Sequence, residues 1–136
     1  MKILFIGDLN EYGRSFQRFR TFGDMGYFVF GISTVQIPYR PGIEKSGFVE
    51  RIMWKLGFPP DTTGANKKIK EAIRSEKFNI IWIEKGVTIR PETLRYIKKN
   101  TPTTKLVFCS EDDMYAKHNR TSYFDTGLKY YDIVFT

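Results

Sequence analysis

Three adjacent carboxylates, Glu111-Asp112-Asp113, directly follow an apolar run and are the first candidates for chemistry in this sequence. Neighbouring carboxylates repel one another, so we expect a raised pKa for some of them. A carboxylate with a raised pKa in a cleft can act as a general base. Helix capping and solvated loop charge are the alternatives, and a metal site would need ligands that converge from elsewhere in the chain.

Two further segments combine charged side chains with glycines. The segment Gly7-Asp8-Leu9-Asn10-Glu11-Tyr12-Gly13-Arg14-Ser15 precedes a predicted helix, and free N–H groups at a helix start suit an anion. The second segment is Glu84-Lys85-Gly86, at the end of another apolar run. A structural turn without a ligand is the alternative for the first segment, and a salt-bridged turn is the alternative for the second.

The single histidine and the single cysteine are weaker candidates. His118 follows the three carboxylates, and one unaccompanied histidine is more often a surface residue than a catalyst and cannot form a metal site by itself. Cys109 lies inside an apolar run, which predicts a buried, inert thiol.

The apolar runs that must position these residues predict five strands separated by helices. We expect strands at 2–7, 27–32, 79–84, 105–110 and 131–136, with helices at 14–25, 47–56, 66–77, from 91, and 122–130. Continuous apolar runs are typical of strands buried on both faces, and therefore of a parallel sheet covered by helices. The sequence predicts one α/β domain over 1–136, a Rossmann-like doubly wound parallel sheet of about five strands.

Three details of the helices are also predicted. Phe16, Phe19, Phe22 and Met25 form the apolar stripe of the first helix. One face of the second helix carries Phe48, Val49, Ile52, Met53 and Leu56. Ser122 with Asp125 is typical of a capping box for the last helix.

The net charge of +7 favours anionic partners such as nucleotide-sugar phosphates, acidic polysaccharide or nucleic acid. Much of this charge lies in 67–77, a pattern typical of the solvated face of a helix. No RNA-binding or zinc-finger signature accompanies it, which disfavours nucleic acid. No signal peptide or apolar stretch long enough for a membrane span is present, so we expect a cytoplasmic protein.

Two nucleotide and signalling functions of this fold class are disfavoured. Dinucleotide binding calls for G-x-G-x-x-G after the first strand and an acidic residue after the second, and both are missing. A receiver domain of two-component signalling needs an acidic pair after the first strand and a phosphorylatable aspartate after the third. Here a lone Asp8 and the pair Glu84-Lys85 stand at those places.

Taken together, the segments resemble the N-terminal half of CgeB-like, spore-maturation type glycosyltransferases of the GT-B superfamily. The likeness spans nearly the whole chain, is weakest between 34 and 64, and depends on the order and spacing of the motifs. The matching pieces are Lys2-Ile-Leu-Phe-Ile-Gly7 with Gly13, the aromatic helix from Phe16 to Phe22, Ile81-Trp82-Ile83-Glu84-Lys85-Gly86, Pro91-Glu92-Thr93-Leu94, Glu111-Asp112-Asp113 and Tyr131-Asp132-Ile133-Val134-Phe135-Thr136.

The resemblance implies transfer of a sugar from a nucleotide-diphosphate sugar, acting as co-substrate, to a sugar or glycan acceptor, with no other cofactor and no metal. It implies Asp112 or Asp113 as the catalytic group at the acceptor hydroxyl, although many relatives use a histidine there. The substrate-binding residues would be Gly7, Asp8, Asn10, Gly13, Arg14, Glu84, Lys85, Gly86, Glu111 and His118.

The chain stops at its last predicted strand, so we expect it to be truncated before a C-terminal donor-binding domain and inactive by itself. An exposed apolar cleft face would then favour self-association. Two other functions stay open: a stand-alone Rossmann-like ligand-binding or regulatory module without catalysis, and a nucleic-acid-associated protein.

Overall fold

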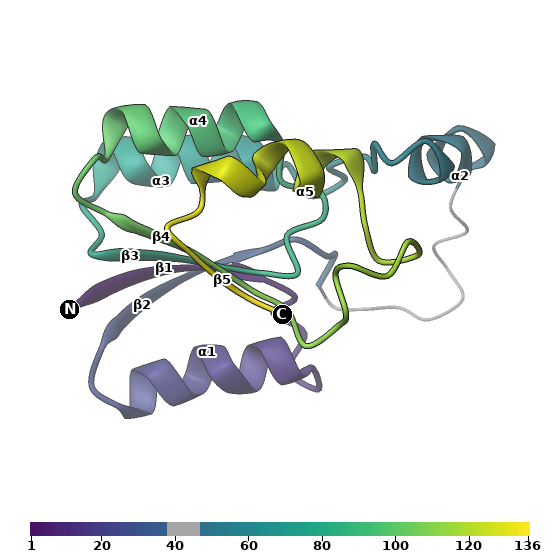
Figure 1. Cartoon of the computed structure of the whole chain (residues 1–136). Coiled ribbons are helices and arrows are strands. Elements are labelled where there is room, and N and C mark those ends of the chain that lie inside the picture. The colour runs from purple at the N-terminus through teal and green to yellow at the C-terminus, as the bar shows by residue number, and fades with distance from the viewer. Residues whose placement is uncertain (38–46) are drawn as a thin grey trace.

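The computed structural model describes residues 1–37 and 47–136, so most of the predicted loop at 34–47 lies outside the described residues (Figure 1). Within them, the chain forms one parallel sheet with helices on both faces. Its strands are β1 (Lys2–Gly7), β2 (Phe28–Ser33), β3 (Ile80–Glu84), β4 (Lys105–Cys109) and β5 (Ile133–Phe135). The predicted α/β doubly wound class and its five strands are confirmed.

The helices connect these strands in the predicted order. They are α1 (Arg14–Asp24), α2 (Phe48–Lys55), α3 (Ala65–Ser75), α4 (Pro91–Asn100) and α5 (Ser122–Gly127), followed by the 3-10 turn η1 (Leu128–Tyr130). Helix α1 covers one face of the sheet, and α3, α4 and α5 cover the other (Figure 1). No helix in the described part of the chain is long and apolar enough to cross a membrane.

The strand order is β2-β1-β3-β4-β5, so the direction of winding reverses between β1 and β3. In open α/β sheets, ligands bind outside the carboxyl ends of the strands at such a switch point. The register pairs Ile6 with Ile83 and Glu84 with Cys109, which brings the residues after β1, β3 and β4 to one edge. The fold therefore selects this edge as the candidate site.

The core has two layers, one on each face of the sheet. On the α1 face, Phe5 packs edge-to-face against Phe19 and Phe22, with ring centroids 5.7 and 6.2 Å apart. On the other face, alternate strand residues pack with one side of α3 and α4: Leu4, Ile6, Ile81, Ile83, Leu106, Phe108, Ile69, Leu94 and Ile97. Each such side chain, fully buried, contributes about 1.5–3 kcal/mol to the hydrophobic stabilisation of the sheet.

Two helix details differ from the sequence predictions. Met25 is 60% exposed and lies outside the stripe, because nine residues at about 100° each place it on the side of the helix opposite Phe16. The cap of α5 is Thr121 rather than Ser122: its Oγ1 accepts a hydrogen bond from the Phe124 N–H at 3.1 Å and donates one to the Val87 carbonyl.

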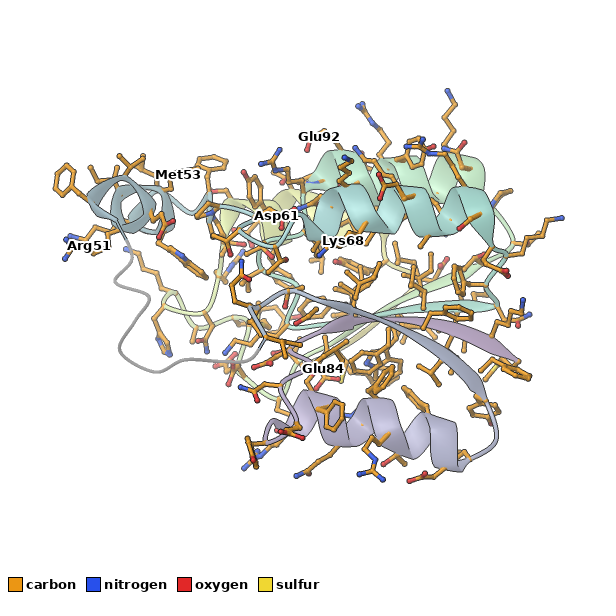
Figure 2. The ribbon with its side chains drawn as sticks, turned by 180° about the vertical axis from the view of Figure 1, so that it is seen from behind. Arg51, Met53, Asp61, Lys68, Glu84 and Glu92 are labelled. Atoms are coloured by element: carbon orange, nitrogen blue, oxygen red, sulfur yellow. The ribbon has the colours of Figure 1, made fainter. Side chains whose placement is uncertain are left out.

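Helix α2 stands apart from the sheet, with Arg51 and Met53 well away from α3 and α4 (Figure 2). It is an amphipathic helix as predicted, but its apolar face is not part of the core. Phe48, Val49 and Leu56 are each more than 60% exposed.

Candidate functional site

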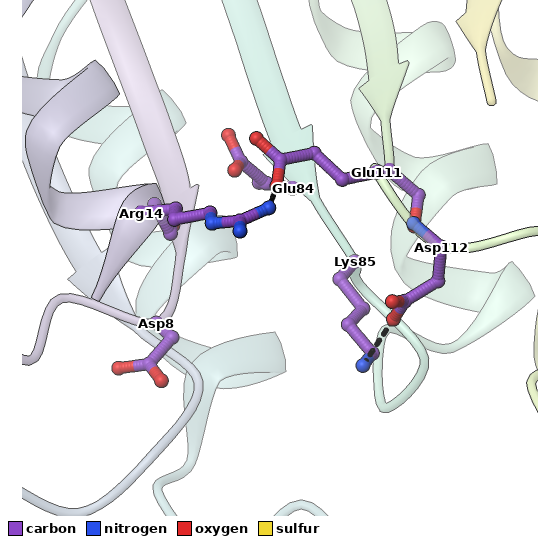
Figure 3. A pocket seen from close by; sticks show the side chains of 8 residues that line it. Asp8, Arg14, Glu84, Lys85, Glu111 and Asp112 are labelled. Atoms are coloured by element: carbon purple, nitrogen blue, oxygen red, sulfur yellow. Dashed lines mark hydrogen bonds and ion pairs between the residues drawn. The ribbon is translucent and has the colours of Figure 1, made fainter.

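The three charged segments of the sequence meet at the carboxyl ends of β1, β3 and β4 (Figure 3). There they line an open depression of about 280 Å³, formed by Asp8, Arg14, Ser15, Glu84, Lys85, Ser110, Glu111 and Asp112. Six of these eight residues belong to the predicted substrate-binding and catalytic set. Sequence reasoning missed Ser15 and Ser110 as lining residues.

Glu84, the last residue of β3, is buried and both of its carboxylate oxygens have partners. Oε1 forms an ion pair with the Arg18 guanidinium, and Oε2 accepts a hydrogen bond from Trp82 Nε1 at 3.2 Å. Arg18 also donates to Glu111 Oε1 at 2.9 Å, so one guanidinium joins the ends of β3 and β4. Burial lowers the pKa of Arg18, but the hydrogen bond and charge of Glu84 outweigh it, so the pKa is raised overall.

Arg18 is the most connected residue at this edge, and the sequence analysis did not identify it. It follows Arg14 by four residues, so both side chains lie on the same side of α1 and point toward the strand ends. That spacing was the available signal. The helix brings a second cation over the sheet edge, where Glu84 would otherwise be a buried, unpaired charge.

Glu111 does not have the raised pKa that we predicted for the acidic cluster. Hydrogen bonds from Arg14 and Arg18 lower the pKa of this carboxyl, and the Arg14 contact is 2.7 Å from Nη1 to Oε2. In the sequence, only the repulsion among neighbouring carboxylates is visible. The fold supplies two guanidinium groups from α1, whose attraction favours the charged form.

Lys85 carries the one positive φ among the non-glycine residues that the structure describes, at 46°. This left-handed conformation turns the chain after β3, and the Lys85 N–H donates to the Cys109 carbonyl at 2.9 Å. The ammonium group then forms an ion pair with Asp112 (Figure 3). The next residue must be small, because a Cβ on Gly86 would stand 2.2 Å from Ile83 Cγ2.

The start of α1 closes the other side of the depression. Its N-cap is Gly13, which offers no side chain to the free N–H groups of the first turn. Ser15 is only 9% exposed, and its hydroxyl has no hydrogen-bond partner among the described residues. A Cβ on Gly7 would stand 2.6 Å from Ser15 Oγ, so the glycine allows the helix start to approach β1 closely.

Other predicted site residues do not line this depression. Asp113 is exposed and accepts a hydrogen bond from the Tyr115 N–H at 2.9 Å, which shapes the loop before α5. His118 is exposed on the same loop, as its lone occurrence suggested. The Asn10 N–H donates to Asp8 Oδ1 at 2.9 Å, a turn contact. Gly7, Gly13 and Gly86 act through backbone geometry and packing.

Metal binding and thiol chemistry have little support among the described residues. Among the described residues, no group of three or more His, Cys, Asp or Glu side chains is placed to hold a metal ion. Cys109 is half-buried rather than buried, and burial raises the pKa of its thiol, so the thiolate is disfavoured.

No protein-family model matches this chain, and no curated protein sequence does. Among solved structures, the chain is similar to a response regulator protein from Burkholderia pseudomallei, crystallised with a phosphorylated aspartic acid, a calcium ion and citrate. The two share 12% sequence identity with a TM-score of 0.55, over 98% of this chain. This chain spans 58% of the length of that protein. Because the identity is only 12%, the likeness is one of fold alone.

This comparison overturns the glycosyltransferase interpretation. The structural likeness is to a response regulator and not to the N-terminal half of a GT-B enzyme, so the family assignment and sugar transfer were wrong. The catalytic role at an acceptor hydroxyl that was given to Asp112 or Asp113 depended on that resemblance and is not carried further. The receiver function was disfavoured because Asp8 stands alone and Glu84 stands where an aspartate is needed, and a likeness of fold at 12% identity leaves these differences in place.

Proposed function

We propose that this chain is a regulatory module with a receiver-like fold, which binds a small oxyanion at the carboxyl edge of the sheet and performs no catalysis. The observation that carries the proposal is the ion-pair network that joins α1 to the loop after β4. Arg14 and Arg18 hold Glu111, while Lys85 holds Asp112. A ligand that displaces Glu111 and Asp112 from these cations would allow the loop after β4 to move.

The first turn of α1 supports an oxyanion as the ligand. Its N–H groups have no side-chain cap, and the buried Ser15 hydroxyl beside them is unpartnered in the described structure. A helix start favours negative charge, and Arg14 and Lys85 line the same depression. The Burkholderia pseudomallei structure contains a phosphorylated aspartic acid, which is a modified residue of that protein, and citrate, and both groups are oxyanions.

The carboxylates of the loop would act as tethered competitors for such a ligand. Glu111 and Asp112 occupy the cations that an incoming phosphate would contact. Exposed ion pairs of this kind contribute only about 0–1 kcal/mol each, so a ligand with several oxygens can displace them. Displacement would free residues 111–112 from α1 and β3, and the resulting loop movement is the regulatory signal.

The state of Glu84 argues against phosphoryl transfer to this residue. Its two oxygens are engaged by Arg18 and Trp82, and its side chain is only 7% exposed. An acyl phosphate would require one oxygen to leave its partner and face the solvent. We therefore expect no phosphoryl adduct on Glu84 after incubation with acetyl phosphate, as read by mass spectrometry.

Titration with inorganic phosphate, followed by amide NMR shifts, tests the proposal. Shifts should concentrate at residues 13–16 and 110–115. Glu111→Gln, which removes a competing charge, should tighten binding, and Ser15→Ala should weaken it. Each change should be about two- to tenfold, as expected for one hydrogen bond or one exposed ion pair. Shifts spread evenly over the protein, or an unchanged affinity in Glu111→Gln, would contradict the proposed exchange.

A further inference from the structure

A second charged region lies between α3 and α4, away from the carboxyl-edge depression. Here an open groove of about 500 Å³ is lined by Asp61, Asn66, Lys67, Lys70, Arg74, Arg90, Glu92 and Thr93. It shares no lining residue with the depression. Helix α3 carries four basic residues and one acidic residue, so its surface is strongly cationic.

Most of the cations in the groove have no internal partner. Lys70, Arg74 and Arg90 form no ion pair within residues 1–37 and 47–136, and Lys67 reaches Glu71 only at 3.8 Å. Lys70 also lies over the Tyr96 ring, 5.7 Å from its centroid, which holds the side chain along the groove. Four positive charges therefore face two carboxylates, and the groove is net positive.

One of the two carboxylates already has a structural task. Asp61 accepts hydrogen bonds at 2.8 Å from the N–H groups of Ala65 and Asn66 and from Asn66 Nδ2, so it caps α3. Glu92 lies in the first turn of α4, where negative charge suits the helix dipole. Both lie at the same end of the helix pair (Figure 2), and the acidic residue farther along α3 is Glu71, which lies 3.8 Å from Lys67.

The spacing of the cations defines an elongated binding surface. Lys67, Lys70 and Arg74 recur at intervals of three and four residues, so they form one stripe about 10 Å long on α3. Arg90 lies at the start of the opposite wall. Thr93 is 1% exposed and lines the groove.

We propose that this groove binds an acidic segment of a partner protein. Carboxylates of such a segment can pair with the two arginines in the bidentate geometry that guanidinium favours, and Lys70 can contact the side chains between them. A nucleic acid strand fits less well, because no aromatic residue is among those that line the groove. Stacking of bases needs an open aromatic surface, whereas Tyr96 is half-buried beneath Lys70.

The test is the binding of a fluorescently labelled oligo-glutamate peptide to the whole chain, followed by fluorescence anisotropy at low salt. The double variant Lys70→Glu/Arg74→Glu should weaken binding about tenfold or more, since each reversal replaces an attraction by a repulsion. Glu92→Gln should tighten it about two- to fivefold. Arg20→Glu on α1, an exposed reversal on the other face of the sheet, is the matched control and should change affinity less than about twofold.

Three results would overturn the proposal. The first is an absence of saturable peptide binding by the wild-type chain at low salt. The second is an equal loss of binding free energy per reversed charge in the Arg20 control and the double variant, which would show general charge attraction. The third is tighter binding of an oligothymidine of the same net charge, weakened by the same double variant, which would assign the groove to nucleic acid. Circular dichroism of each variant confirms that these comparisons use folded protein.

Discussion

At the carboxyl edge of the sheet, Arg14, Arg18 and Lys85 each hold a carboxylate of the same chain. In the α3–α4 groove, Lys70, Arg74 and Arg90 form no close ion pair that the structure describes, although the charge of Arg90 helps to lower the pKa of Asp61. The cations of the first region are internally paired, and the second region is net positive and open. Charges of the same type thus have two different physical situations in one small domain.

The difference arises from burial. Glu84 is nearly inaccessible at the end of β3, and a buried carboxylate without a partner would be strongly destabilising, so Arg18 is required there. The groove cations extend from helices into solvent, where an unpaired charge costs little because water solvates it. A paired charge fixes the structure, whereas an unpaired surface charge leaves interaction energy for a partner.

The largest expected difference between the two regions is in the free energy of unfolding after one arginine is removed from each. Arg18→Met leaves Glu84 buried without its cation, and we expect a loss of about 2–3 kcal/mol in the free energy of unfolding, reduced from the fully buried case because Arg18 is 28% exposed. Arg74→Met should change it by less than about 0.5 kcal/mol. Urea denaturation of the two variants measures the contrast.

The partner of Arg18 offers a control for this prediction. In the double variant Arg18→Met/Glu84→Gln, the buried charge is gone and the amide oxygen can still accept from Trp82 Nε1. Most of the stability should return. Equal losses in Arg18→Met and Arg74→Met would mean that the edge network is no more structural than the groove.

A smaller effect is expected from filling the turn after β3. Gly86→Ala places a methyl group 2.2 Å from Ile83 Cγ2, and such overpacking costs about 1–3 kcal/mol. Gly23→Ala is the matched control, because a Cβ there meets nothing within 4 Å and lies inside α1. It should stabilise the protein by about 0.5–1 kcal/mol. Thermal unfolding of the pair should therefore shift in opposite directions, and shifts of the same sign would show that the turn is not tightly packed.

Much of the fold could be predicted from the sequence because it depends on short-range patterns. The five apolar runs and the glycine and proline positions between them located every strand to within a residue or two. The prediction that Met25 belongs to the apolar stripe of α1 was wrong, because residues spaced by three move progressively around the helix. The apolar face of α2 was read correctly, but amphipathicity does not say whether anything packs against it, and Phe48 is 73% exposed.

The site was predicted only in part, because its contacts join residues far apart in the chain. The strand-end rule brought Asp8, Glu84 and Glu111 together, and this was correct. Arg18 lies 66 residues from Glu84 in sequence, and its role depends on where α1 crosses the edge. The family resemblance gave a wrong function, since motifs at strand ends recur throughout doubly wound folds and specify the fold better than the chemistry.

The last of the expected stability effects is a pH dependence that involves Asp61 in the groove and Glu111 at the sheet edge, two carboxyls with lowered pKa values. Burial raises the pKa of Asp61, but hydrogen bonds from Asn66 and Ala65 outweigh it and the pKa is lowered, as it is for Glu111 through Arg14 and Arg18. A lowered pKa in the folded state gives stability that is present above the unfolded value and lost as pH falls through the folded value.

Asp61→Ala should therefore cost about 1–2 kcal/mol at neutral pH, as for a lost helix cap. This difference from wild type should shrink below about pH 4, the usual pKa of an unfolded aspartate. Glu111→Gln should show a weaker pH dependence with the same sign, because its contacts are exposed. Urea denaturation between pH 7 and pH 3 measures both. A larger pH effect for Glu111 would make the edge carboxylate a structural cap rather than a displaceable competitor, and would reverse the distinction between the two regions.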